Sequence, residues 1–302
     1  MEQKNGLIIK GTGGLYDIML ENGEAVSCRA KGIFRHESLT PTVGDRVSVG
    51  TDEQGNSIID GIDERKNILI RPPLANLDIL FIVIPSKRPI PDYYTADKLS
   101  AIAYHNGIQP VIIASKCVLD EKTAEATESI YKNVFPTFVT DAVSGVGISS
   151  LEEYIAENCA GKISAFSGAS GAGKSTLMNA LFPALALSTS EVSARTGRGR
   201  HTTRTVELFQ TPSGAFIADT PGFTMLDFEQ FDFFDLEHLP LAFPEIEKKL
   251  GECRYTKCTH RKEEGCAVLD GIKNGEISES RHESYKSLYE ILKNKHSWNK
   301  KQ

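Results

Sequence analysis

A phosphate-binding loop is the feature of this 302-residue sequence whose residue types and spacing most clearly indicate chemistry. Residues 168–175 are G-A-S-G-A-G-K-S, which matches the pattern GxxxxGK[ST]. An apolar run precedes the loop and a helical pattern follows it, so the context favours this interpretation over a chance glycine-rich turn. We expect Lys174 to reach the β- and γ-phosphates and the Ser175 hydroxyl to bind Mg²⁺. The residues predicted to hold the phosphates are Gly168, Ala169, Ser170, Gly171, Ala172, Gly173, Lys174, Ser175 and Thr176.

A second nucleotide motif follows farther along the chain. Asp219-Thr220-Pro221-Gly222 ends an apolar run and matches DxxG. We expect Asp219 to bind Mg²⁺ through water and the backbone N–H of Gly222 to contact the γ-phosphate. Alone, D-T-P-G is also compatible with an ordinary turn, but its place after a phosphate-binding loop favours the nucleotide motif.

The segment between the two motifs, "RTGRGRHTTRT" at 195–205, is rich in Gly, Arg and Thr. This composition suits a switch loop in which Thr203 binds Mg²⁺ only in the triphosphate state. The alternative is a solvated basic loop, which would leave the two consecutive threonines unexplained.

The base-reading part of the site lies before the phosphate-binding loop. GTPases need an NKxD motif, and nothing downstream of DxxG fits it. Upstream, the apolar run "PVIIA" ends in Ser115, Lys116, Cys117 and Val118 at the place where N-K-x-D is expected. Farther on, "VTDAVSGVGISSL" at 139–151 resembles the loop that supports the guanine. This order predicts a circularly permuted GTPase.

Strands and helices must alternate to position these motifs. Apolar runs predict strands at 78–84, 110–114, 135–139, 163–167, 205–210 and 215–219. Helical patterns intervene around 92–106, 122–133, 149–158 and 174–182. The alternation predicts an α/β domain with a mostly parallel sheet.

Short alternating runs bounded by Gly, Asn or Asp occupy Gly6 to about Ile70 and predict a small antiparallel β domain. Five such strands fit an oligonucleotide-binding (OB) barrel. A barrel that only supports its neighbour fits equally well. The stretch "RPPLANLD" at 71–78 has the composition of a linker.

The permuted order, "GRGRHTT", "DTPGF" and a cysteine cluster near the C-terminus together resemble the RsgA (YjeQ/YloQ) family of ribosome-small-subunit-dependent GTPases, over nearly the whole chain. The resemblance implies a multidomain protein: an OB-fold RNA-binding domain at 1–70, a permuted P-loop GTPase domain at 71–228 and a mostly helical zinc-binding domain at 229–302. It implies a Mg²⁺-dependent GTPase that binds the small ribosomal subunit and its rRNA. Subunit-stimulated hydrolysis of GTP to GDP and phosphate would assist late subunit maturation.

The resemblance also indicates how water would be oriented. The residue after DxxG is Phe223, which cannot orient water as the Gln of Ras-like enzymes does. The family points to His201 as the replacement, since an imidazole can position or polarise water. A solvent-exposed loop histidine is the alternative.

The cysteine cluster has its own chemistry. Four residues, Cys253, Cys258, His260 and Cys266, follow the pattern C-x(4)-C-x-H-x(5)-C, a Cys₃His set suited to tetrahedral Zn²⁺. Four protein ligands leave no position for a catalytic water, so we expect one structural zinc ion. The alternatives are disulfides, which a reducing compartment disfavours, and chance.

Lys and Arg in "CRYTKCTHRK" offer contacts to RNA phosphates, whereas the last ten residues are better explained as a solvated basic tail.

The base-reading segment departs from the family pattern. Ser115 and Val118 stand where Asn and Asp are expected, and a valine side chain cannot accept hydrogen bonds from guanine. Asp120 is an alternative acceptor if the loop is re-registered. The departure keeps a second function open, a nucleotide-gated rRNA-binding module with little or no guanine-specific turnover. A third is a degenerate member that binds RNA without turnover.

Composition sets the remaining expectations. The hydrophobic content of 40% and charged content of 25% describe an ordinary globular protein. The longest apolar runs are too short to span a bilayer, and the N-terminus lacks the pattern of a signal peptide. A net charge of −6 argues mildly against bulk attraction to nucleic acid. We expect a cytoplasmic monomer with no membrane contact.

Overall fold

The structure is a computed structural model, and it describes residues 4–32, 34, 39–70, 73–183, 206–223 and 235–299. The chain divides into two compact units. The first comprises Met1–Ile79, Leu151–Phe166 and Met178–Phe223, and the second comprises Leu80–Ser150, Ser167–Leu177 and Thr224–Gln302.

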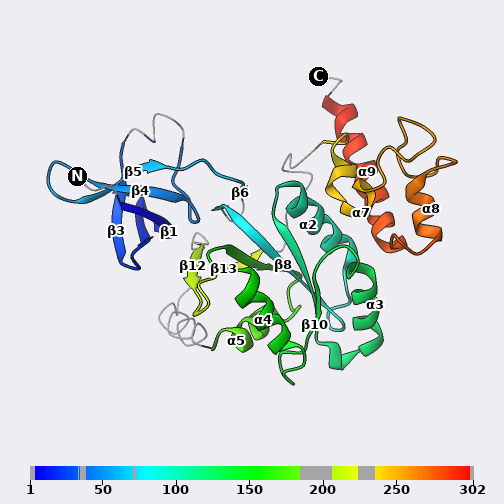
Figure 1. The fold of residues 1–302 in the computed structure, drawn as a ribbon, viewed down its shortest axis with the longest axis horizontal. Helices are drawn as coiled ribbons and strands as arrows, with labels where there is room; N and C mark the ends of the chain where they lie inside the picture. The colour runs from blue at the N-terminus through cyan, green and yellow to red at the C-terminus, as the bar shows by residue number, and fades with distance from the viewer. Residues whose placement is uncertain are drawn as a thin grey trace. The chain divides into compact units, whose positions relative to one another are not determined.

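The N-terminal strands of the first unit close into a barrel, drawn in blue in Figure 1. The strands are β1 (Lys4–Thr12), β2 (Leu15–Leu20), β3 (Ala25–Ala30), β4 (Arg46–Thr51) and β5 (Ser57–Ile62). β1 pairs with both β2 and β4, β2 pairs with β3, and β4 pairs with β5. A parallel pairing of β3 with β5 completes the ring. This closure confirms the predicted OB-type barrel.

Alternation along the strands builds the barrel core. Side chains at every second position point to one face of a strand, so the apolar members of the alternating runs meet inside the ring. The buried side chains include Ile8, Ile18, Cys28, Val47 and Ile59. The polar positions between them face outward.

The prediction of a linker at 71–78 is wrong for residues 73–78, the part of this stretch that the structure describes. β6 (Ile68–Ile70) and β7 (Pro73–Ala75) form an antiparallel hairpin, and Leu74, Ala75 and Leu77 are fully buried. Asn76 takes a positive φ of 56°, and its side-chain amide donates to Gly44 O at 2.9 Å. Proline-rich composition suggested a linker, but tertiary burial of Leu74 and Leu77 prevails.

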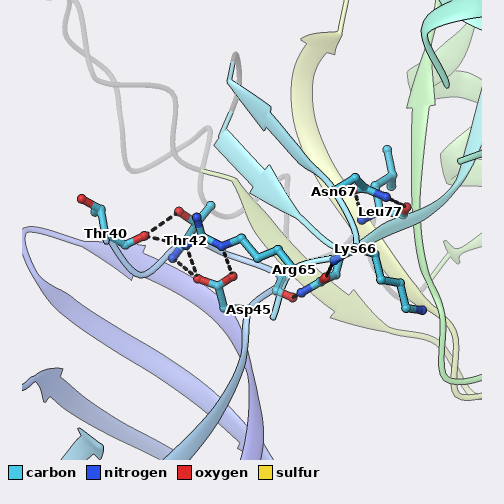
Figure 2. A network of polar contacts seen from close by, with 9 residues as sticks. Thr40, Thr42, Asp45, Arg65, Lys66, Asn67 and Leu77 are labelled. Carbon is cyan, nitrogen blue, oxygen red and sulfur yellow. Dashed lines mark hydrogen bonds and ion pairs between the residues drawn. The ribbon is translucent and has the colours of Figure 1, made fainter. Parts of the chain in front are cut away.

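Polar contacts hold the segments on either side of this hairpin (Figure 2). The guanidinium of Arg65 donates to both carboxylate oxygens of the fully buried Asp45, at 2.7 and 2.8 Å, and to Thr40 O. The Asn67 side chain pairs with both backbone groups of Leu77. The segment after the barrel is therefore a packed, hydrogen-bonded connection.

The rest of the first unit supplies three strands: β11 (Ile163–Ser167), which ends one residue into the second unit, β12 (Glu207–Gln210) and β13 (Phe216–Phe223). β12 and β13 are antiparallel, and β12 also meets β1, where Lys10 pairs with Glu207 at 2.9 Å. Three further elements, β8 (Leu77–Pro85), α4 (Ile148–Asn158) and α5 (Lys174–Leu181), have residues in both units.

The second unit begins with alternating strands and helices. β9 (Gln109–Ser115) and β10 (Thr137–Val139) are parallel. In the chain, α2 (Tyr93–His105) precedes β9, and α3 (Glu121–Tyr131) lies between β9 and β10. β9 is buried along nearly its whole length, as expected for a strand of a covered parallel sheet. Asp92 caps α2 by accepting the N–H of Thr95.

The C-terminal part of the second unit is mostly helical, as predicted. It contains η2 (Leu239–Ala242), α7 (Pro244–Glu247), α8 (Ala267–Lys273) and α9 (Glu279–Asn299). α9 packs against α2 (Figure 1). None of the helices within the described ranges combines the length and the apolar character needed to cross a bilayer.

Candidate nucleotide and metal sites

The phosphate-binding loop runs from the buried strand β11 into α5. Gly168 takes a φ of +144°, and a Cβ atom there would lie 2.3 Å from Val83 O. Gly173 also has a positive φ, of 96°. Only glycine fits both the backbone angle and the close approach at residue 168, so the glycine spacing of the motif is a requirement of this turn.

Lys174, the first residue of α5, turns back over the loop. Its Nζ donates to Gly168 O at 2.7 Å and to Ala169 O at 3.0 Å. Burial lowers the pKa of this half-buried lysine, because desolvation disfavours the ammonium. A phosphate bound in the loop would offset that effect. Ser175 and Thr176 are exposed at the start of the helix.

The predicted base-reading segment contacts this loop directly. The buried Ser115 donates from Oγ to Ala172 O at 2.7 Å. Lys116 Nζ donates to Gly171 O and to Arg88 O, both at 2.6 Å. The structure therefore brings together two segments that lie more than fifty residues apart in sequence. Arg88 was not singled out from sequence, because a backbone carbonyl leaves no signal in residue type.

The residues after Lys116 form a short turn. η1 (Cys117–Leu119) places Cys117 inside and leaves Val118 half exposed. Asp120 then caps α3, since its Oδ1 accepts the backbone N–H of Thr123 at 3.2 Å. The N–H of Cys117 donates to Thr140 O at 3.1 Å, so this turn also touches the loop that follows β10.

The structure describes only some of the other residues predicted to bind the nucleotide. Asp219 and Gly222 lie on β13, where the backbone of Asp219 is opposite Glu207. The predicted strand end at 219 is therefore corrected, because β13 continues through the DxxG motif to Phe223. His201 and Thr203 lie outside the described residues.

The four predicted metal ligands converge. The ligand atoms of Cys253, Cys258, His260 and Cys266 all lie within 4.8 Å of one another. The Sγ atoms of Cys253 and Cys266 are 3.9 Å apart, and His260 Nδ1 lies 3.5 and 3.6 Å from them. Tetrahedral Zn²⁺ with its usual bond lengths requires S···S of about 3.8 Å and S···N of about 3.5 Å. The donor set and its spacing fit a zinc ion.

The protonation of His260 and the hydrogen bonds of the surrounding chain support the same interpretation. Burial lowers the pKa of His260, which favours the neutral imidazole that metals bind. Burial raises the pKa of the Cys258 thiol to about 12, so a zinc ion would have to displace the thiol proton to bind the thiolate. His260 has a φ of +59°, and its carbonyl contacts His282 Nε2 at 2.7 Å. Glu263 accepts the backbone N–H groups of Thr259, Arg261 and Lys262, so its carboxylate organises the metal-binding turn.

A buried ionic cluster in the second unit was missed from sequence. Arg281 on α9 is fully buried and donates to Asp97 on α2 at 2.8 Å and to Glu245 on α7. Tyr131 donates to the same Asp97 oxygen at 2.8 Å, and the Arg281 guanidinium lies 5.1 Å from the centre of the Phe243 ring. Burial opposes the charge of Arg281, but Glu245 and Asp97 outweigh it and raise its pKa. The only sequence signal was an Asp within the apolar face of α2.

Family models match almost the whole length of the chain. A model described as RsgA N-terminal domain matches residues 5–59, and one described as RsgA GTPase matches residues 62–229. The chain belongs to the RsgA GTPase family. A model described as 50S ribosome-binding GTPase matches residues 163–298 and so begins at β11, whereas the family model also includes the residues before it.

Relatives of known name share more than a third of their residues with this chain. A small ribosomal subunit biogenesis GTPase RsgA from Thermotoga maritima is 39% identical over 277 residues, which cover 90% of this chain and 91% of that protein. The protein of the same name from Lactococcus lactis is 38% identical, covering 99% of this chain and 98% of its own.

Solved structures have the same fold. The crystal structure of YjeQ from Thermotoga maritima has a TM-score of 0.81 and 33% identity, covering 96% of this chain and 99% of that one. YloQ, described as a circularly permuted GTPase, has a TM-score of 0.78 and 31% identity, covering 97% and 96%. The predicted fold class is confirmed: an N-terminal OB-type barrel, a permuted P-loop GTPase domain and a C-terminal part with a Cys₃His cluster.

Proposed function

We propose that this chain is a Mg²⁺-dependent GTPase that binds the small ribosomal subunit and assists its late maturation. It would hydrolyse GTP to GDP and phosphate, faster when bound to the subunit. Relatives at 39% and 38% identity have the name small ribosomal subunit biogenesis GTPase RsgA. The observation in this chain that best supports the proposal is the phosphate-binding loop held against Ser115 and Lys116.

The nucleotide roles follow from this geometry and from the motifs. Backbone N–H groups of residues 168–176 would bind the phosphates, and Lys174 would exchange its contacts with Gly168 O and Ala169 O for phosphate oxygens. The base would lie against Ser115, Lys116, Cys117 and Val118.

Ser175, Thr203 and Asp219 would hold Mg²⁺, and Gly222 would contact the γ-phosphate through its backbone N–H. The ion neutralises charge that develops on the phosphate oxygens.

The reaction is attack of water on the γ-phosphorus with release of the GDP leaving group. We assign Lys174 and Thr203 to stabilisation of the transferred phosphoryl group and His201 to orientation of the attacking water.

Thr202 and Thr203 form a matched pair for testing the switch. Thr203→Ala should lose Mg²⁺-dependent turnover while Thr202→Ala retains it.

The proposed domains are an OB-fold RNA-binding domain at 1–70, a permuted GTPase domain at 71–228 and a zinc-binding domain at 229–302. The Cys₃His cluster would hold one structural zinc ion, since all four positions are filled by protein ligands. We propose that the protein is a cytoplasmic monomer whose partners are the small subunit, its rRNA, GTP and GDP.

Phosphate release from GTP is the direct test. We expect slow Mg²⁺-dependent release by the protein alone and clear stimulation by purified small subunits, with no stimulation by large subunits. Absence of both nucleotide binding and stimulated release would contradict the proposal.

A nucleotide-gated rRNA-binding module is the second candidate, and Val118 in place of an acidic residue favours it. Co-sedimentation with small subunits distinguishes the states. We expect tight binding with a non-hydrolysable GTP analogue and weaker binding with GDP, because loss of the γ-phosphate releases the contacts of Thr203 and Gly222. Gating without subunit-stimulated release would favour this second candidate.

A further inference from the structure

Two loops of the second unit meet beside the phosphate-binding loop. One contains residues 115–120 and the other residues 140–147, and they are joined by the hydrogen bond from Cys117 N to Thr140 O. The first loop also bonds to Gly171 O and Ala172 O of the phosphate-binding loop. A nucleotide whose phosphates occupy that loop therefore places its base against these two loops, if the proposed function holds.

Recognition of guanine has a clear chemical requirement. The base presents two neighbouring donors, N1–H and the exocyclic N2 amino group, and a carboxylate is the side chain best suited to accept both. A site built around such a pairing rejects an analogue that lacks it by several orders of magnitude, whereas an apolar site rejects little. The carboxylates of the two loops thus decide which bases are accepted.

Asp141, in the second loop, is committed to its own turn. The residue is buried, and its Oδ1 accepts the N–H of Val143 at 3.1 Å and both the N–H and the hydroxyl of Ser144 at 2.8 and 2.9 Å. Its backbone N–H also bonds to Val146 O. Using this Oδ1 to bind a base would break the hydrogen bonds that shape the loop.

Asp120, in the first loop, is committed to the start of α3. Its Oδ1 accepts the N–H of Thr123, and its backbone is extended, as an N-cap residue requires. Re-registering the loop to aim Asp120 at a base would leave the first turn of α3 without its cap. Glu121, one residue later, is exposed and is the remaining carboxylate at this end of the helix.

The large side chains that these loops expose are instead aliphatic. Four side chains remain substantially exposed, with fractions of 50% for Val118, 49% for Leu119, 88% for Val143 and 46% for Val146. Aliphatic groups contact the flat face of any purine and make no hydrogen bond that separates one base edge from another.

From these observations we infer that the site accepts purine nucleotides with little selection at the purine 2-position. GTP and ITP, which differ only in the exocyclic N2 amino group, are both substrates, and adenine nucleotides compete. Val118 is the specificity-determining residue, because it occupies the position from which a carboxylate would reach that edge. The inference rests on the proposed function and specifies its substrate class.

Titration of the wild-type protein with GDP, IDP, XDP and ADP in Mg²⁺ tests the inference without turnover. We expect GDP and IDP affinities within about threefold of each other and ADP within about a hundredfold of GDP. A preference for GDP over IDP of about tenfold or more would overturn it. If only GDP binds, the inference fails and the proposed function stands. If no diphosphate binds, both fail.

Matched variants identify the determinant. Val118→Asp should raise the GDP-to-IDP preference by about tenfold or more. Asn133→Asp, an equal change in charge at an exposed position after α3 and outside both loops, should leave the ratio unchanged. Val118→Asn should shift preference toward XDP, whose C2 carbonyl can accept from the amide. If Glu121→Gln or Asp120→Asn lowers the GDP-to-IDP preference while Val118→Asp does not raise it, another residue selects the base and the inference is wrong.

Discussion

The hydroxyl of Ser115 donates a 2.7 Å hydrogen bond to the backbone carbonyl of Ala172, a residue 57 positions later in the chain. Both residues are buried, and the bond ties the end of β9 to the phosphate-binding loop. Serine thus keeps a connection between the two halves of the nucleotide site, although it stands where the NKxD pattern has asparagine.

Ser115→Ala should weaken GDP binding and lower the free energy of unfolding by about 1 kcal/mol, because a buried carbonyl loses its donor. Calorimetric titration and thermal unfolding measure the two effects. Ser86→Ala is the matched control, since the Ser86 hydroxyl is buried without a hydrogen-bond partner among the described residues. Equal losses in both variants would mean that the Ser115 bond contributes nothing specific.

Lys174→Ala should reduce nucleotide affinity by about a hundredfold or more, because a charge-assisted contact to the phosphates is lost. The fold should remain intact, since the ammonium bonds only to carbonyls of its own loop. GDP titration together with circular dichroism checks both points. Lys122→Ala, at an exposed position of α3, should bind GDP normally. Unchanged turnover in Lys174→Ala would refute the site assignment.

Purified protein should contain about one zinc ion per chain. Cys258→Ser or chelation should remove it and expose the amides of residues 250–268 to hydrogen exchange, because structural zinc contributes folding free energy directly. Cys28→Ala changes a buried cysteine of the barrel that is not one of the four ligands, and this variant should retain the zinc. Metal analysis that finds far less than one ion in the wild type would rule out the assignment.

Arg281→Met should destabilise the second unit by about 3–5 kcal/mol, because it leaves two buried carboxylates without their cation. Denaturant unfolding gives the value. The exposed Arg254, which lies 3.9 Å from Glu264, serves as the comparison, and Arg254→Ala should change stability by less than about 0.5 kcal/mol. If the two variants lose similar amounts of unfolding free energy, the carboxyl groups of Asp97 and Glu245 are uncharged once Arg281 is removed.

The metal-binding turn exposes Arg254, Tyr255 and Lys257, and the Arg254 guanidinium lies 5.6 Å from the Tyr255 ring centre. This combination suits an unpaired RNA base stacked on the ring. Tyr255→Ala should weaken small-subunit binding by about 1–3 kcal/mol. Lys257→Ala should reduce the slope of log affinity against log salt concentration by about 1, which corresponds to the loss of one phosphate contact. Lys132→Ala should leave this slope unchanged. An unchanged salt dependence in Lys257→Ala would place the RNA contact elsewhere.

Much of the site was predictable because its chemistry depends on short-range spacing. The glycines of the phosphate-binding loop are required by the backbone path at Gly168, and the four metal ligands lie close together in the chain. In the α/β domain, the expected strands and helices agree with the described elements to within about two residues, except at the end of β13, which lies four residues later. The agreement follows because buried β9 and amphipathic α3 have the periodicities of their classes.

The errors have equally specific causes. Residues 73–78 pack instead of linking, because Leu74 and Leu77 find a buried environment that proline content does not reveal. The strand bearing DxxG runs on past Asp219 to Phe223, and it lies between β11 and β12 in the sheet. Both outcomes depend on what lies opposite the segment in space.

By itself the sequence determined the nucleotide motifs, their permuted order and the Cys₃His ligand set, because residue type and local spacing specify each of them. Only the tertiary structure decided that Asp120 caps α3, that Asp141 serves its own turn and that Arg281 meets Asp97 from 184 residues away. A charged side chain has the same identity at a helix cap, in a buried pair or at a base-binding edge. Which role it takes depends on the groups that folding brings within hydrogen-bond distance. For Asp120 and Asp141 these are backbone N–H groups two or three residues away, and for Arg281 the partner is 184 residues away.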